Sequence, residues 1–539
     1  MFPRIKSFKN KDGSIRHYLY LVETKRIAGR VKQVITANLG RLDKADRNLP
    51  DIIEKLSKFT NRLKIINLSR DMKSDWVKEY GSVIIFRRLW EKLGIDGHLK
   101  KYLSKRKIGF NAEGLIYTMV LNRLMEPKSE LAIHDWSKSL YGIKPPEDLN
   151  QWYRALDFFI EHKEIIEKDL FESQKDLFNS EVDIVLMDTT SLVYFGDGDK
   201  AESILNYGYS KEKRFDLKQV IVGILMTKEG LPIGHEVYPG NTNDIGAFKE
   251  MIRVVKTRFK IRRVVIVCDR GMVSEDNIQT LESDGYEYVV GMRMRQLKTE
   301  NAKKILSIKD MAPVTKELKG KEVHLKGRRL IVCFNEEESL KDKKKREEII
   351  ARLIVKLKTQ GLKSLLIHKE YSKYLKIKAD KPSLDEERVK SEELFDGKFV
   401  LETNTKLNWK EVILSYKDLW RVEAAFRTLK NELEIGPVYH YTERRIRAHI
   451  FISFLALVLK ATFHKALLNI DKSLSLTKVL EDARKIKATQ ITIKDAPLVL
   501  RTELEGNAHL AFKAVELKIP PRILDNPHGI QENVVVRLS

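Results

Sequence analysis

The stretch Ser415–His440, SYKDLWRVEAAFRTLKNELEIGPVYH, decides how the rest of the chain is interpreted. Its periodicity predicts one long amphipathic helix that ends at Gly436-Pro437, because glycine and proline both terminate helices. The apolar residues of this stretch repeat at helical spacing, so they form a stripe that would dock the helix onto a hydrophobic core. The residues of this stripe are Leu419, Val422, Phe426 and Leu429.

A second face of the predicted helix carries polar groups. Tyr416, Glu423 and Lys430 are spaced seven residues apart and therefore share one face. A carboxylate between an aromatic hydroxyl and a cation is unusual for a structural face, although spacing alone favours an ordinary solvated surface. Two further carboxylates upstream, each at the predicted end of a strand, shift the interpretation towards a functional site.

Length and charge narrow the class of protein. A chain of 539 residues can form several domains, and a hydrophobic fraction of 42% excludes wholesale disorder. Lys and Arg number 100 against 76 Asp and Glu, which leaves a net charge of +24. A surplus of this size predicts a polyanionic partner, with nucleic acid as the first candidate and an anionic membrane surface as the second.

Cysteines and hydropathy indicate the compartment. Cys268 and Cys333 lie in apolar runs, so we expect two buried thiols in a reducing environment and no disulfide framework. The N-terminus lacks the apolar segment of a signal peptide. The apolar run Ile450–Leu459 is about half the length that a bilayer span needs, which predicts a buried core helix. We expect a cytoplasmic protein without a membrane partner.

The first third of the chain divides into two predicted regions. Residues 1–45 form a basic β-hairpin unit, because HYLYLVE and RVKQVITANLG are two β-rich runs. Residues 46–180 form a helical DNA-binding region, in which Asn111 caps a helix over Ala112–Met125. A solvated hairpin and a solvated basic loop are the simpler alternatives for the basic residues of this part. The basic residues of that loop are Lys100, Lys101, Lys105, Arg106 and Lys107.

An α/β core follows. The runs VDIVLMDTTSLVYF, DLKQVIVGILMT, LPIGHEVYPG, RRVVIVCDRG and YEYVVGMR predict five strands. A helix capped by Asn243 or Asp244 is expected before the fourth strand, and a helix capped by Ser274 after it. The order β-β-β-α-β-α-β is that of a ribonuclease H-like core with a mixed five-stranded sheet. We expect its first part at 181–295, a β-rich insertion at 296–396, its second part with the Glu423 helix at 397–470 and a C-terminal region at 471–539.

Three carboxylates of this core predict a metal site. Asp188 and Asp269 are expected at strand ends, and Glu423 on a helix packed against the sheet. Carboxylates that meet at one edge repel each other, and divalent cations relieve that repulsion. Mg²⁺ prefers oxygen ligands, and two such ions roughly 3.5–4 Å apart can activate a hydroxyl and stabilise the leaving oxygen of a phosphodiester. A single Asp at a strand end is more simply a turn cap; three carboxylates in this order favour catalysis.

Four separated segments together resemble the DDE transposases of bacterial insertion sequences, in the insertion-sequence-4 superfamily. They are MDTTS at Asp188, FDLKQVIVGILMTKEGLPIGHEVYPGNTND, VVIVCDRGM at Asp269, and the Tyr416–Lys430 helix followed by PVYHYTERRIRAHIFISFLAL. The resemblance covers roughly Glu181–Lys460 and extends more weakly to TANLGRLD in the N-terminal hairpin.

The resemblance implies an activity and its partners. It implies Mg²⁺-dependent cleavage at transposon ends and strand transfer into target DNA, with Mn²⁺ as a substitute ion. The implied partners are double-stranded terminal inverted repeats, target DNA and a second copy of the chain when assembled on DNA. The implied location is the nucleoid of a prokaryotic cytoplasm.

One position departs from the family pattern Tyr-x2-Arg-x3-Glu-x6-Lys. Tyr416, Glu423 and Lys430 match it, but Leu419 occupies the arginine position. In the family, the tyrosine and the cations of this motif hold terminal phosphates near the cut. Arg427, one turn past Glu423, is our hypothesis for a substitute, whereas Arg421 is expected to point away.

Several secondary candidates accompany the three carboxylates. The basic run Arg444, Arg445 and Arg447 is a credible phosphate contact because it is dense in arginine. The hydroxyls after Asp188 could support a metal site or only cap a turn, and His235 is more simply structural. Trp409 and Trp420 could stack on an unpaired base, although core packing is the simpler expectation. The remaining candidates are Thr189, Thr190, Ser191, His440 and His449.

Three other functions compete with a transposase. A related nuclease would cleave DNA without joining it. A catalytically inactive DNA-binding descendant is favoured slightly by Leu419, whereas the intact carboxylate triad opposes it. A basic membrane-surface protein would need an amphipathic anchor helix, and none is evident in the sequence.

Overall fold

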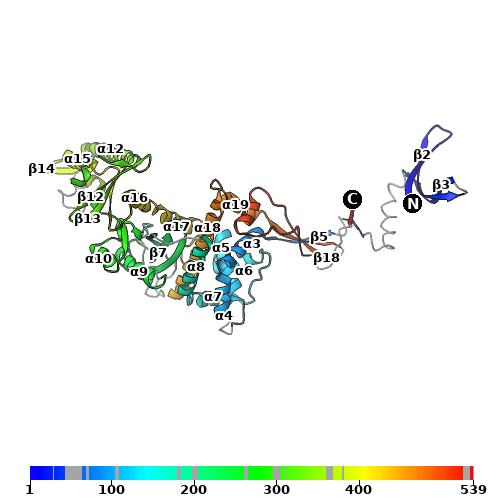
Figure 1. The fold of residues 1–539 in the computed structure, drawn as a ribbon, viewed down its shortest axis with the longest axis horizontal. Coiled ribbons are helices and arrows are strands. Elements are labelled where there is room, and N and C mark those ends of the chain that lie inside the picture. Colours follow the sequence, from blue (N-terminus) through cyan, green and yellow to red (C-terminus); the bar gives the residue numbers. More distant parts are fainter. Residues whose placement is uncertain are drawn as a thin grey trace. The chain divides into compact units, whose positions relative to one another are not determined.

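The computed structural model describes residues 1–27, 30–42, 64–67, 72–103, 108–178, 184–196, 204–259, 265–294, 304–308, 310–359, 368–378, 381–493, 495–525 and 534–537. These residues divide into two compact units (Figure 1). The terminal unit comprises residues 1–80, 485–504 and 519–539, and the central unit comprises residues 81–484 and 505–518.

The terminal unit is built from β-strands. β1 (Phe2–Lys9), β2 (Ile15–Ile27) and β3 (Arg30–Arg41) form an antiparallel sheet. The predicted hairpin is the pair β2–β3, and its turn at residues 28–29 lies outside the described residues. β4 (Lys64–Asn67) pairs with β20 (Val534–Arg537), and a further sheet has the order β19-β18-β17-β5. Its strands are β5 (Met72–Glu79), β17 (Lys487–Ile493), β18 (Ala496–Arg501) and β19 (Ile523–Asp525).

The sequence predicted a helical region over residues 46–180, but the structure does not make this range helical throughout. β4 and β5 lie within this range. β5 becomes a strand because it pairs antiparallel with β17, which lies far along the chain. Local sequence patterns cannot show such a distant partner, so the prediction of helix was wrong here.

Helices form the first part of the central unit, as predicted. The Asn111 side chain accepts a hydrogen bond of 3.0 Å from the Gly114 amide and caps α5 where expected. Lys100 and Lys101 lie on α4, whereas Lys105, Arg106 and Lys107 lie outside the described residues. The helices are α3 (Gly81–Lys92), α4 (Ile95–Leu103), α5 (Ala112–Met125), α6 (Glu130–Ser137), α7 (Asn150–Ile160) and α8 (Lys163–Phe178).

α18 (Glu443–Ile470) is the core helix of the central unit. Its apolar residues are buried all round, and Phe451 stacks on Phe159 of α7 with ring centroids 4.3 Å apart. Among the described residues, α18 alone is long and apolar enough to cross a membrane, and 83% of its most apolar window is buried inside the protein. α19 (Leu476–Arg484) and α20 (Ala508–Ala514) complete the helices of this part.

A large mixed sheet forms the second part of the central unit. Its order is β11-β12-β13-β16-β10-β9-β6-β7-β8. The five predicted strands are neighbours in it. β6 pairs antiparallel with β7, and β7 with β8, whereas β9 pairs in parallel with β6 on one side and with β10 on the other. Their bounds are β6 (Ile184–Val193), β7 (Gln219–Thr227), β8 (Pro232–Pro239), β9 (Val265–Cys268) and β10 (Glu287–Gly291). The helices α9 (Asp244–Thr257) and α10 (Glu275–Ser283) precede and follow β9, and Asn243 and Ser274 cap them as expected.

The sheet is larger than predicted because strands of the expected insertion extend it. β16 (Lys398–Thr403) pairs with β10 on one side and with β13 on the other. Buried Leu330, Val332 and Val400 form one hydrophobic cluster across this junction. The prediction that 296–396 stands apart from the core was therefore wrong for three of its strands, β11 (Ala312–Pro313), β12 (Leu318–Leu325) and β13 (Arg328–Asn335). Two further strands, β14 (Leu375–Lys378) and β15 (Lys381–Leu384), form a separate two-stranded sheet. The helices of this region are α12 (Glu336–Thr359), α14 (Lys369–Ser372) and α15 (Glu386–Glu393).

The single long helix predicted for Ser415–His440 is two helices. α16 (Trp409–Lys417) ends at Asp418, and α17 (Trp420–Asn431) begins after Leu419. The Leu419 amide donates to the Tyr416 carbonyl at 3.1 Å, a tight i→i−3 bond that breaks the α-helical ladder. Tyr416 and Glu423 therefore lie on different helices.

Candidate active site

The sheet places Asp188 and Asp269 at the same level. β6 and β9 pair in parallel from Ile184↔Val265 to Met187↔Cys268, and each aspartate directly follows the last pair. Asp269 follows its strand as predicted. Asp188 does not, because β6 continues along β7 to Val193. The parallel pairing ends at Asp188 although the strand does not, so this carboxylate still lies at the edge of the β6–β9 pair.

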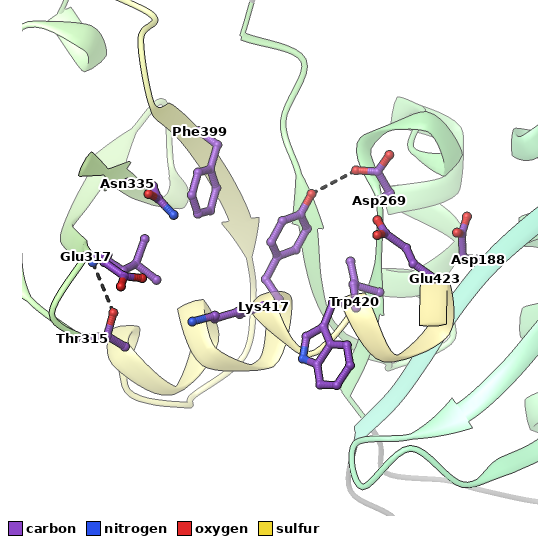
Figure 2. A pocket seen from close by; sticks show the side chains of 12 residues that line it. Asp188, Asp269, Thr315, Glu317, Asn335, Phe399, Lys417, Trp420 and Glu423 are labelled. Atoms are coloured by element: carbon purple, nitrogen blue, oxygen red, sulfur yellow. Dashed lines mark hydrogen bonds between the residues drawn. The ribbon is translucent and has the colours of Figure 1, made fainter. Parts of the chain in front are cut away.

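Glu423 reaches the two aspartates from α17. The predicted apolar stripe is buried and docks this helix: Val422 is 0% and Leu429 2% exposed. Glu423 lines a cavity of about 290 Å³ together with Asp188 and Asp269. Figure 2 shows Asp188, Asp269 and Glu423 turned towards one another at one end of this cavity, whereas Glu317 lies at the other end.

Electrostatics at Asp188 reflect a shortage of positive charge. Burial, together with the nearby carboxylates of Asp269 and Asp244, raises the pKa of Asp188 to about 6. Lys211 opposes this rise, but its Nζ atom is 3.8 Å from Asp188 Oδ1. The Thr189 amide donates to the same Oδ1 atom at 2.7 Å. The site thus concentrates negative charge that its neighbours compensate only in part.

Tyr416 contacts the site directly. Its hydroxyl donates a 3.0 Å hydrogen bond to Asp269 Oδ1, and burial and Asp269 raise the pKa of Tyr416 above its ordinary range. The ring reaches this position because Gly291 has no side chain: a Cβ atom there would lie 2.5 Å from the tyrosine hydroxyl. Gly291 therefore permits the approach of Tyr416 to Asp269.

Two charged residues at the site were missed by the sequence reasoning. Lys211 lies in the loop between β6 and β7, and its Nζ atom donates to the Thr189 carbonyl at 2.6 Å. Asp244, the first residue of α9, accepts a 2.5 Å hydrogen bond from Thr189 Oγ1 and lies 3.7 Å from Lys211. Asp244 stood out in the sequence only as a helix cap, and nothing marked Lys211, because its position depends on the path of the loop.

The other residues of the family motif, and the two arginines near it, differ in whether they line the cavity. Leu419, 9% exposed, lines the cavity where the family has arginine. Lys430 donates to Glu212 Oε1 at 2.6 Å. Arg427 is exposed, does not line the cavity, and has no hydrogen bond or ion pair within the described part of the chain. Arg421 pairs with Asp418 and lines a different cavity, so it points away as expected.

The basic run after α17 is engaged within the protein. Arg444 donates to the Asp157 carbonyl, and Arg445 makes a bidentate pair with the Asp157 carboxylate at 3.1 and 3.0 Å. Arg447 donates to Glu443 and to the Val237 carbonyl. The structure thus brings none of these three arginines into the lining of the carboxylate cavity.

The secondary candidates fall into structural and exposed groups. His235 is 1% exposed and bonds Glu167, which confirms a structural role, and both cysteines are buried as expected. Trp409 packs near Gly320, whereas Trp420 is 53% exposed and lines the cavity, which corrects the expectation of core packing. Among the hydroxyls after Asp188, Thr190 is buried and Ser191 accepts from the Lys211 amide.

The site thus brings together carboxylate oxygens, which are the ligand type that Mg²⁺ and Ca²⁺ prefer in proteins. A family model described as "Transposase DDE domain" matches residues 180–459. A second, the N-terminal domain of the IS1634 family transposase, matches residues 3–71. The chain belongs to the DDE transposases of insertion sequences, and transposition of DNA is its function.

Comparisons with individual proteins are weaker. The piggyBac transposase in a synaptic complex with hairpin DNA is 11% identical, with a TM-score of 0.37 over 76% of this chain and 82% of that one. The Mos1 transposase in a paired-end complex with the left transposon end is 16% identical, with a TM-score of 0.15 over 36% and 57%. No curated protein matches the chain. Membership of the family therefore depends on the two family models.

Proposed function

We propose that this transposase cuts the ends of its element and joins them to target DNA at the cavity formed by Asp188, Asp269 and Glu423. One observation carries the proposal: Asp188 of β6, Asp269 at the end of β9 and Glu423 of α17 line one cavity, and among the described residues Lys211 is the one cation within ion-pair distance of any of them. The strand order β8-β7-β6-β9-β10 supports a ribonuclease H-like core, in which the first and fourth strands lie side by side.

The donor set fits Mg²⁺, with Mn²⁺ as a substitute. The three side chains offer only carboxylate oxygens, which are the ligands that Mg²⁺ prefers. Burial and the nearby carboxylates together raise the pKa of Asp188 by more than Lys211 and the Thr189 amide lower it, and a divalent cation would stabilise the anion further. Two bound ions would activate the attacking hydroxyl and stabilise the leaving oxygen of a phosphodiester.

The chain's own residues would hold these ligands in place. Tyr416 fixes one oxygen of Asp269, and Thr189 links Asp188 to Asp244 through its amide and hydroxyl. Lys211 lies close to Asp188 and would reduce repulsion among the carboxylates before a metal binds. These contacts limit side-chain motion, so the carboxylates would be preorganised for metal binding.

Phosphate contacts are assigned to cations around the cavity. Lys430 would release Glu212 and bind a DNA phosphate instead, and the exposed Arg427 would contact a further phosphate of the same DNA. Arg444, Arg445 and Arg447 would contact DNA only with the donors that Asp157, Glu161 and Glu443 leave unused.

Recognition of the terminal inverted repeats is assigned to the N-terminal region. The sheet β1–β3 presents exposed cations on a β-ribbon, a form that can track a phosphate backbone. Two chains would pair the two ends of the element as a homodimer on DNA. The exposed cations of this sheet include Arg4, Lys9, Arg16, Lys25, Arg26, Arg30 and Lys32.

Cleavage of a labelled duplex that carries the element's end tests the proposal. With Mg²⁺, we expect the wild type to cut at the end and to join the product to a second DNA, and Asp269→Ala to bind the duplex without cutting. Cutting without joined products would indicate a nuclease. Binding without cutting by the wild type would indicate an inactive descendant, with Leu419 as the first suspect.

A further inference from the structure

Three side chains that commonly ligate metals meet at a second place in the central unit, away from the carboxylate cavity. Glu130 is the first residue of α6, His440 lies between α17 and α18, and His449 lies on α18. Glu130 Oε1 is 3.2 Å from His440 Nε2 and 3.2 Å from His449 Nδ1. One ligand atom from each residue lies within 4.8 Å of the other two.

These distances match the spacing of zinc ligands. Zn²⁺ binds imidazole nitrogen and carboxylate oxygen at about 2.0–2.2 Å in tetrahedral geometry, which places neighbouring ligand atoms roughly 3.3 Å apart. Both distances from the Glu130 oxygen are close to this value. The fourth position would open onto a cavity of about 700 Å³ that Glu130, His440 and His449 help to line, so water can occupy it.

The hydrogen bond made by His449 leaves a ligand atom directed at Glu130. His449 Nε2 lies 2.9 Å from the Ile435 carbonyl, which can only accept, so Nε2 carries the proton. In the neutral ring Nδ1 is then unprotonated and faces the Glu130 carboxylate. Two acceptors at this distance need a cation or a proton between them. A ligating histidine typically donates its other nitrogen to a backbone carbonyl in this way.

Arg123 also approaches the cluster, with its Nη2 atom 3.8 Å from Glu130 Oε1. A metal bound here would take the unprotonated Nδ1 atom of His449 and the Glu130 carboxylate as ligands, since metals bind neutral imidazole and ionised carboxylate.

His440 supplies the remaining argument. Its Nε2 atom is buried, and no residue of the described chain gives it a hydrogen bond of acceptable geometry. A buried polar atom without a partner is rare in proteins and calls for an unseen ion or water. Its nearest ligand-type neighbour is Glu130 Oε1, at 3.2 Å.

We propose that Glu130, His440 and His449 bind one zinc ion. It would fix the segment that follows α17, because the Ile435 carbonyl bonds His449 and the Glu434 carbonyl bonds Arg123. Val438 of the same segment exchanges backbone hydrogen bonds with Val193 and Phe195 at the end of β6. The zinc would thus connect the helix of Glu423 to the strand of Asp188. Its binding does not depend on DNA cleavage.

Metal analysis of the untagged full-length chain tests this site. The protein carries Asp188→Ala and Asp269→Ala, so that the carboxylate cavity cannot hold metal, and is dialysed against Zn²⁺ with excess Mg²⁺. We expect one zinc per chain, unaffected by Mg²⁺, which disfavours nitrogen ligands. Replacement of zinc by Co²⁺ should give the visible absorption bands of a four-coordinate ion.

Variants of the ligands decide the outcome. Adding His440→Ala, or the milder His440→Gln if the first fails to fold, should weaken zinc binding at least tenfold and remove the cobalt bands. His464→Ala, which alters an exposed histidine further along α18 and outside the cluster, should retain both. Absence of zinc from the parent protein, or equal zinc in the folded His440 variant, would overturn the proposal.

Discussion

Two groups of acidic residues in the central unit have their negative charge compensated in opposite ways. In the paired group, Glu167 of α8 is fully buried, and its carboxylate accepts from the His235 amide and ring, Lys163 and Arg258. In the open group, Asp188, Asp269 and Glu423 line a cavity, and among the described residues only Asp188 has a cation within ion-pair distance, Lys211 at 3.8 Å. Carboxylates that are paired with cations of the protein thus stabilise the fold, whereas carboxylates without such partners remain available to bind a ligand.

The pKa values of the two groups express this difference. Although burial alone would raise it, Lys163, His235 and Arg258 hold the pKa of Glu167 at about 2. Burial and like charges instead raise the pKa of Asp188 to about 6. Both carboxylates are wholly or largely shielded from water, so the supply of cations, rather than burial alone, separates them.

The largest expected effect is loss of catalysis from the open group. Glu423→Gln removes a charge from the cluster, and we expect cleavage of an end duplex with Mg²⁺ to fall roughly a thousandfold or more, since bound metal contributes several kcal/mol to the transition state. The thermal unfolding midpoint without metal should not fall, because no ion pair is lost. Glu432→Gln, at the end of the same helix, is the control and should cleave normally. Normal cleavage by Glu423→Gln would remove it from the site.

The paired group should respond in stability instead. Glu167→Ala leaves Lys163 and Arg258 buried with one anion fewer, which should cost about 3–5 kcal/mol in the free energy of unfolding measured with urea. Glu164→Ala removes an exposed partner of Arg258 from the same helix and should cost less than about 1 kcal/mol. Equal losses for both would show that burial does not decide the value of these pairs.

The pH dependence of metal-free stability sharpens the contrast. The pKa of Asp188 is about 6 in the folded chain against 3.8 ordinarily, so the folded protein binds its proton more tightly than the unfolded one. The stability that this proton supplies is complete below about pH 4 and is lost as pH rises through about 6. Thermal unfolding with a chelator should show this loss in the wild type, and Asp188→Asn should not show it. Identical pH profiles would contradict the assignment.

The smallest expected effect concerns Tyr416. Tyr416→Phe removes one hydrogen bond to Asp269, and a bond to a charged group is worth about 1.5–3 kcal/mol. We expect cleavage to fall by about tenfold or somewhat more, with little change in the unfolding midpoint. Tyr439→Phe alters an exposed hydroxyl after α17 and should leave the rate unchanged. No loss in Tyr416→Phe would show that other groups suffice to orient Asp269.

Local patterns predicted local structure well. Apolar runs located β6–β10, and the caps Asn111, Asn243 and Ser274 located the starts of three helices. The order of these elements also indicated that Asp188 and Asp269 lie on neighbouring strands. In each of these cases, the residues that determine the element lie within it or within a few residues of its start.

Contacts between distant residues were beyond the sequence. The pairing of β13 with β16 and the approach of Lys211 to Asp188 depend on partners that no local pattern identifies. The run Arg444–Arg447 resembled a free basic patch, yet Asp157, far away in the chain, pairs with part of it. Whether a charged side chain is available to bind DNA can therefore be judged only once its neighbours in the folded structure are known.

Diffraction from crystals soaked in Mn²⁺ tests most directly whether incomplete compensation marks the catalytic site. We expect anomalous peaks at Asp188, Asp269 and Glu423, and none at Glu167, whose oxygens already accept from four donors. Asp269→Ala crystals should lose the peaks. Full manganese sites elsewhere with none among these three carboxylates would contradict the account.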